Sequence, residues 1–170
     1  MFITITRRPL TTKESHMLAG ETKQSLYIGY IKPQIWQDLG DVFIACYKGV
    51  LIGVCATVSL VGWVKIGPFI VMSSYQGKGV GKRLLTHVTT YFKNINVYLG
   101  SSNPKVIQMA SNLRFQNIGF VKLPREVKLY LISYLLQRAS WEYIVDALRK
   151  KLTSKRFVYK YFIKPKNFKL

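Results

Sequence analysis

The sequence has few acidic residues, and one long stretch has none. Its 170 residues contain 7 Asp and Glu against 26 Lys and Arg, which gives a formal net charge of +19. No acid lies between Val42 and Arg125, whereas ten bases do. No carboxylate within that stretch can act as a general base, and its charge favours a phosphate-rich ligand. A solubilising surface is the alternative, although such surfaces usually mix both signs.

Cysteine is also scarce. Two cysteines, Cys46 and Cys55, are too few for a disulfide scaffold or for a zinc site with four ligands, so we expect no metal. A hairpin closed at residues 48–49 would place Cys46 opposite Leu51 and Cys55 opposite Val42, out of register for a bridge. We therefore expect buried thiols in a reducing, cytoplasmic compartment.

Long apolar runs are absent too. The first eight residues contain no apolar stretch after a basic region, so they do not resemble a secretory signal. The longest uncharged apolar run, Val50 to Val64, falls short of the ~20 residues of a spanning helix. With 49% apolar and 19% charged residues, the chain is too hydrophobic for disorder and fits a single domain over residues 1–170.

Hydrophobic periodicity predicts a mixed α/β chain. We expect strands at residues 2–6, 42–47, 50–60, 63–72, 95–99, 120–123 and 156–163. We expect helices at residues 33–39, 80–93, 104–117, 124–136 and 140–152. Gly67-Pro68 should interrupt regular pairing of the strand that contains it, because proline has no N–H for the ladder. Gly119 is expected to stop the helix that begins at Pro104.

The clearest chemical signal lies where a strand ends and a helix begins, in the segment Gln76-Gly-Lys-Gly-Val-Gly-Lys82. Its glycines let the backbone approach a ligand and adopt positive φ, which turns successive N–H groups outward. The new helix adds unpaired donors and partial positive charge, so the pattern predicts a pyrophosphate site. A tight connection without a ligand is the alternative. Neither a Walker loop nor the dinucleotide fingerprint fits this glycine spacing.

This segment resembles the phosphate loop, Arg/Gln-x-x-Gly-x-Gly/Ala, of the GNAT superfamily of acyl-CoA-dependent N-acetyltransferases. Residues 69–85 are similar to that family's fourth strand, loop and third helix, and the likeness extends over about residues 42–123. It implies a GNAT-like fold, with a central, mostly antiparallel splayed sheet flanked by helices. In this chain a helical insertion at about 124–154 precedes the last strand. The implied reaction is acetyl transfer from acetyl-CoA to a primary amine that the sequence does not identify.

The resemblance also implies which residues bind the cosubstrate. The pantetheine arm would pair with the strand end at Ile70 and Val71, and an amide at Val71 or Met72 would polarise the acyl carbonyl. The pyrophosphate would lie on the loop and the helix start, at Gln76, Gly77, Lys78, Gly79, Val80, Gly81 and Lys82.

The chain departs from the family at its catalytic positions. Many relatives carry an Asn and, seven residues later, a Tyr that protonates the CoA thiolate; here these positions are Gln108 and Phe115, and phenylalanine cannot donate a proton. Ser102 and Tyr98, near the end of the preceding strand, are the candidates to replace it, each with a purely structural role as its alternative. Glu126 is the nearest candidate base in the sequence, unless it only opens a helix.

The insertion and the C-terminal end leave the acceptor open. The two predicted helices of residues 124–154 would wall the acceptor site or only extend the core. Bases interleaved with aromatics over residues 149–169 suit contact with nucleic acid such as tRNA or DNA, or a basic strand whose aromatics face the core. An acetyltransferase is the first hypothesis. A catalytically idle GNAT-like module that binds nucleic acid or an acidic partner is the second.

Overall fold

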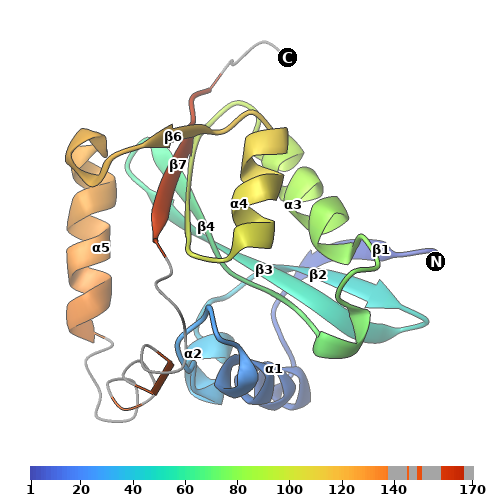
Figure 1. The fold of residues 1–170 in the computed structure, drawn as a ribbon. Helices are drawn as coiled ribbons and strands as arrows, with labels where there is room; N and C mark the ends of the chain where they lie inside the picture. Colours follow the sequence, from blue (N-terminus) through green and yellow to red (C-terminus); the bar gives the residue numbers. More distant parts are fainter. Residues whose placement is uncertain (138–144, 146–148, 151–157, 167–170) are drawn as a thin grey trace. The chain divides into compact units, whose positions relative to one another are not determined.

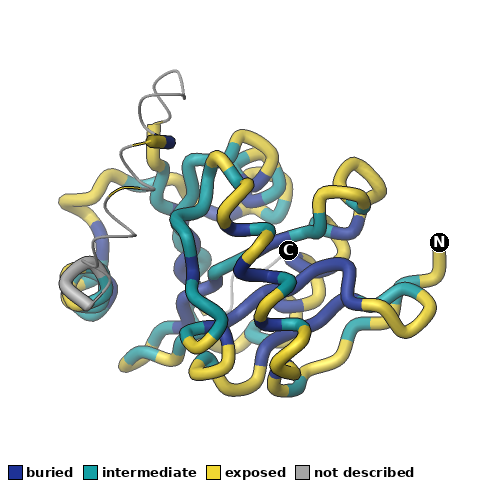
Figure 2. The backbone as a smooth tube through the Cα atoms, turned by 90° about the horizontal axis from the view of Figure 1, so that it is seen from below, coloured by how far each residue is buried: buried dark blue, intermediate teal, exposed yellow. Residues whose placement is uncertain are grey.

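The computed structural model describes residues 1–137, 145, 149–150 and 158–166. The chain forms two compact units, one of residues 1–57 and 67–91 and the other of residues 58–66 and 92–170. The strands form a seven-stranded sheet in the order β1-β2-β3-β4-β5-β7-β6, flanked by helices (Figure 1). This architecture confirms the predicted mixed α/β fold class. Buried residues are concentrated at 42–45, 51–56, 64–67 and 97–99, whereas the turns between elements are mostly exposed (Figure 2).

The first unit holds the N-terminal strands and three helices. In chain order its elements are β1 (Thr4–Arg8), α1 (Thr12–Gln24), α2 (Pro33–Gln37), β2 (Val42–Tyr47), β3 (Val50–Leu60), β4 (Trp63–Val71), the 3₁₀ turn η1 (Ser73–Tyr75) and α3 (Val80–Tyr91). β3 and β4 also run through the second unit. β1 pairs antiparallel with β2, and β2 with β3. The bounds predicted for β2 and β3 are confirmed.

β2 is buried on both faces because its alternate side chains meet different helices. Phe43 lies against α3, with its ring in edge contact with His87 at 5.9 Å and Tyr91 at 5.2 Å between ring centroids. Val42 and Ile44 belong instead to a core cluster that includes α1 and α2 residues. The side chains of the continuous apolar run of β2 thus pack against helices on both faces of the strand.

The hairpin of β2 and β3 corrects one predicted pairing. Cys46 lies opposite Leu51 as expected, but Cys55 lies opposite Phe43 and not Val42. The register shifts by one residue between Ala45 and Cys46, an irregularity that counting back from the turn cannot detect.

The second unit holds the C-terminal strands. Its elements are β5 (Asn96–Ser101), α4 (Pro104–Asn112), β6 (Gln116–Ile118), the 3₁₀ turn η2 (Phe120–Lys122), α5 (Arg125–Gln137) and β7 (Lys160–Lys164). β5 is parallel to β4 and antiparallel to β7, and β6 is antiparallel to β7. α5 confirms the first helix of the predicted insertion; the expected helix at 140–152 lies almost entirely outside the described residues.

Two predictions for residues 104–123 are wrong. α4 ends at Asn112, because Arg114 adopts a left-handed φ of +60° and the Phe115 N–H donates to the Ala110 carbonyl at 3.0 Å. This is the Schellman ending, which usually requires glycine at the left-handed position. With arginine there, the sequence offers no stop signal before Gly119. The predicted strand at 120–123 is instead the 3₁₀ turn η2.

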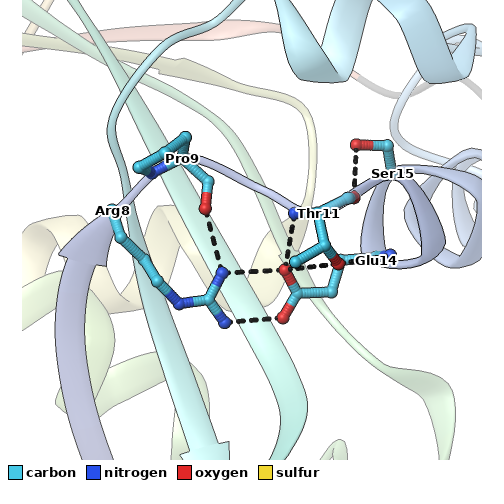
Figure 3. A network of polar contacts seen from close by, with 5 residues as sticks. All are labelled: Arg8, Pro9, Thr11, Glu14 and Ser15. Atoms are coloured by element: carbon cyan, nitrogen blue, oxygen red, sulfur yellow. Dashed lines mark hydrogen bonds and ion pairs between the residues drawn. The ribbon is translucent and has the colours of Figure 1, made fainter.

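A paired charge fixes the start of α1 (Figure 3). The Arg8 guanidinium donates two hydrogen bonds to the Glu14 carboxylate, at 2.6 and 2.8 Å. The Thr11 N–H donates to the same carboxylate at 2.9 Å, and the Thr11 hydroxyl accepts from the Glu14 N–H, which completes a capping box. These hydrogen bonds lower the pKa of the Glu14 carboxyl to about 2, and the bond from Arg8 has the largest effect.

We predict that Glu14→Gln lowers the free energy of unfolding by roughly 1–2 kcal/mol at pH 7. Because the folded-state pKa of Glu14 lies below its unfolded value, this contribution is present above pH ~4.5 and is lost as pH falls toward 2. Chemical denaturation of both proteins from pH 7 to 3 measures it, with exposed Asp38→Asn as the control. A difference that persists unchanged at pH 3 would contradict the assignment.

Candidate functional site

β4 leaves its ladder with β5 partway along its length. The parallel pairing runs from Trp63 opposite Asn96 to Ile66 opposite Leu99, whereas β4 continues to Val71. The change follows the sequence, since Gly67 has a φ of +117° and Pro68 has no N–H to donate. The predicted interruption at this dipeptide is confirmed. The end of β4 therefore lies outside the β4–β5 ladder.

A glycine of β3 lets this strand end and α3 come close together. A Cβ built on Gly53 would lie 3.2 Å from the Ile70 carbonyl oxygen and 3.3 Å from Cγ1 of Val80. Sequence reasoning missed Gly53 as a site residue, although a lone glycine inside a strand pattern is a signal of close backbone approach. Any larger residue would displace the strand end or the first turn of α3.

One of the two amides proposed to polarise the acyl carbonyl is already engaged. The Met72 N–H donates to the Ile52 carbonyl at 3.0 Å. Val71 is therefore the candidate that remains. Its own carbonyl accepts a 3.2 Å hydrogen bond from the side-chain amide of Gln76, which ties the loop back to the end of β4.

The loop between η1 and α3 has the conformation that its glycines predict. Gly77 and Gly79 have φ values of +77° and +78°, and a Cβ on either would meet only open space. Residues 76–79 are exposed, while Val80 is buried and anchors the helix start. The alternation of positive-φ glycines and exposed residues holds the backbone at the surface, where a ligand can approach it.

The loop and the first turn of α3 carry a row of backbone donors. The first helical bond runs from the Arg83 N–H to the Gly79 carbonyl at 3.1 Å, so the amides before it have no helical acceptor. None of the backbone hydrogen bonds described for the turns, loops and helix caps has its donor among residues 77–82. Consecutive backbone donors at a helix N-terminus are the arrangement that an anion site requires.

Basic side chains surround these donors. The Lys78 ammonium lies 5.1 Å from the centroid of the Tyr75 ring, and Lys82 is exposed on the first turn of α3. The Arg83 guanidinium donates to the Met1 carbonyl at 3.4 Å. A phosphate group bound at the amides would thus meet mobile positive charge as well as fixed dipoles.

Sequence reasoning also missed a carboxylate at the end of β4. Glu21 of α1 accepts hydrogen bonds from the Ser73 N–H at 3.3 Å and the Ser73 hydroxyl at 3.2 Å. Ser73 is two residues past Val71, which places the carboxylate beside the strand end. Nothing in the sequence connects Glu21 with a strand that ends fifty residues later.

The catalytic candidates predicted from the sequence lie in the second unit. Tyr98 is fully buried in a cluster with Leu123 and Val127, and desolvation raises the pKa of its phenol. Ser102 follows β5 and is half-buried, and Glu126 is half-buried in the first turn of α5. Their catalytic roles stay predictions. Within the described residues, no group of three His, Cys, Asp or Glu is placed to hold a metal ion.

Solved structures share this fold at low sequence identity. N-acetylglutamate synthase from Neisseria gonorrhoeae, complexed with coenzyme A and N-acetyl-glutamate, has a TM-score of 0.65 at 14% identity; the match covers 96% of this chain and 35% of that one. NAA60 from Arabidopsis thaliana, in complex with a bisubstrate analogue, has a TM-score of 0.62 at 16% identity, covering 96% and 99%. The Escherichia coli ribosomal-protein-S18-alanine N-acetyltransferase has 0.56 at 17%, covering 68% and 80%.

These identities show the fold, and this chain spans about a third of the synthase chain. No curated protein matches the sequence. The model of the Acetyltransferase (GNAT) family matches residues 13–114, a range that contains β4, the loop with its backbone donors, and α3. Since that match covers more than half of the residues, the chain belongs to the acetyltransferase (GNAT) family.

Proposed function

We propose that this protein transfers an acetyl group from acetyl-CoA to a primary amine. The row of amides at residues 77–82, which runs from the glycine loop into the first turn of α3 beside exposed basic side chains, is the observation that carries the proposal. It offers a pyrophosphate the donors and the positive dipole that such a group needs. Membership of the family and the coenzyme A in the structure of the similar synthase support the same ligand.

Different residues of the chain would bind CoA and orient the reacting groups. The amides at 77–82 hold the pyrophosphate, and Ile70 and Val71 offer the pantetheine arm a strand edge outside the β4–β5 ladder. The amine nitrogen attacks the thioester carbonyl carbon, the C–S bond breaks, and the sulfur leaves as a thiolate. The Val71 N–H stabilises the oxyanion. Placing amine and thioester together contributes ~7 kcal/mol or more to lowering the barrier.

Glu21 is the carboxylate of the first unit best placed to accept the amine proton. Glu14 is bonded to Arg8 with a pKa of about 2, which makes it too weak a base. Asp41 pairs with Arg7 at 3.9 Å, and Asp38 is exposed after α2. Glu21 is held at Ser73, whose Cα lies within about 7 Å of that of Val71 by chain geometry. A water molecule could bridge the remaining distance to the amine.

We predict that Gly79→Glu weakens CoA binding at least about 30-fold, because it adds a negative charge where the helix dipole favours an anion. Isothermal titration with CoA measures the change. Gly49→Glu is the matched control, since Gly49 has a φ of +76°, open space around its Cβ, and a place in the β2–β3 turn. Unchanged affinity in folded Gly79→Glu protein would refute the loop assignment.

We predict that Glu21→Gln lowers kcat by 10²-fold or more, the usual contribution of a general base. The Kd for CoA should stay within about twofold, because Glu21 takes no part in the loop that binds the pyrophosphate. Glu21→Asp should recover part of the rate, and Asp38→Asn should behave as wild type. A Glu21→Gln enzyme that keeps the wild-type kcat, or that loses CoA affinity in step with kcat, would show that Glu21 only supports the strand end.

A second function, that of a catalytically idle GNAT-like module that binds nucleic acid or an acidic partner, is favoured by one observation. Phe115, at the family's tyrosine position, is buried, and the Lys164 ammonium lies 5.8 Å from its ring centroid. Thiol release from acetyl-CoA across a panel of amines, peptides and tRNA separates the two functions. Turnover with any acceptor supports the transferase, and tight CoA binding without turnover on the whole panel supports the module.

A further inference from the structure

α5 carries apolar side chains on its solvent side as well as on its buried side. Val127 is fully buried in the core of the second unit, with Leu131 packed against the same cluster. On the opposite side Leu129 is 57% exposed and Ile132 is 52% exposed. Leu129 and Ile132 are three residues apart and therefore neighbours on one helix face, and adjacent exposed aliphatic side chains mark a contact surface. The outer side of α5 therefore has the composition of an interface.

Two turns of the second unit extend this apolar surface. Val61, in the turn between β3 and β4, is 83% exposed and lines a groove of about 900 Å³ together with Leu129 and Ile132. Val121 of η2 is 84% exposed, and its carbonyl accepts a 2.7 Å hydrogen bond from the Lys128 ammonium of α5. We refer to Val61, Val121, Leu129 and Ile132 as the apolar patch.

Basic residues border the apolar patch. Lys122 and Arg125 are exposed, and Lys128 is half-buried beside Val121. Glu126 is the one acid among the residues that line the described groove. The border belongs to a strongly basic unit, since residues 58–66 and 92–170 contain 17 of the 26 Lys and Arg and three of the seven acids.

The combination of basic and exposed aliphatic side chains favours one class of partner over two others. A second copy of the chain would bring two strongly basic units together, at the cost of electrostatic repulsion. Nucleic acid matches the bases, but it pairs with aromatic platforms and offers nothing to exposed Val, Leu and Ile. Tyr130 is the aromatic residue of the groove, and the Lys65 ammonium already lies over its ring, 5.4 Å from the ring centroid. An anionic lipid surface matches both features, with headgroups for the bases and acyl chains for the aliphatics.

We infer that the apolar patch and its basic border dock the second unit onto an anionic bilayer surface. The protein would lie on the membrane, with the tips at Val61 and Val121 entering the headgroup region. No helix in the described part of the chain is long and apolar enough to cross a bilayer. The inference does not depend on the acetyltransferase proposal, because the residues that carry it take no part in the CoA site.

Flotation with lipid vesicles tests the inference on the full chain. We expect binding to phosphatidylcholine vesicles that contain about a third phosphatidylglycerol, and at least tenfold weaker binding to pure phosphatidylcholine. The triple variant Val61→Ser, Leu129→Ser, Ile132→Ser should lose most of the binding. Lys122→Gln with Arg125→Gln should weaken it about fivefold per charge removed.

A matched variant controls for net charge. Lys93→Gln with Lys105→Gln removes two exposed bases of the same unit outside the patch and should bind vesicles nearly as wild type. Thermal unfolding and CoA titration of each variant establish that it is folded. Equal loss in both charge variants, or no vesicle binding by wild type, would overturn the inference. So would patch-dependent binding of RNA without vesicle binding, or a dimer that the triple serine variant dissociates.

Discussion

The backbone between β4 and α3 sets the physical constraint on which the site depends. After Val71 the chain must leave a strand and start a helix by Val80, and the positive-φ glycines Gly77 and Gly79 hold the backbone at the surface just before the first turn of α3. Three features position this segment. The Gln76 side chain donates to the Val71 carbonyl, Glu21 accepts from Ser73, and Gly53 leaves room for the first turn of α3. Fixed donors of this kind need no rearrangement when an anion arrives, which is the physical basis of preorganised binding.

Charged residues are distributed unevenly between the two units. The first unit has acids in specific contacts, and the second has a large excess of bases. In the first unit each acid that makes a described contact has a specific partner, as Glu14 has Arg8, Asp41 has Arg7 and Glu21 has Ser73. In the second unit the bases far exceed the acids and form a broad field. Specific contacts position groups for chemistry, whereas a broad field attracts a large anionic partner.

The sequence predicted the elements whose signal is local. β2 and β3 matched to the residue, because apolar runs bounded by a short turn have no competing interpretation. The glycine loop was recognised for a similar reason, since its glycines, its bases and the helix that follows are contiguous. The end of α4 could not be predicted because Arg114 stands where glycine usually marks a left-handed helix cap. The sequence therefore carries no local signal for this ending. Glu21 was missed because its role depends on a contact across fifty residues.

The proposed activity depends on the amides of residues 77–82 binding the pyrophosphate of CoA. Amide chemical shifts of the ¹⁵N-labelled protein, followed during titration with CoA, test it most directly, because each donor is observed separately. We expect the largest shifts on residues 77–82, and we expect the same shifts with pyrophosphate-containing fragments of CoA. Large shifts confined to other parts of the chain, with these six amides unmoved at saturation, would contradict it.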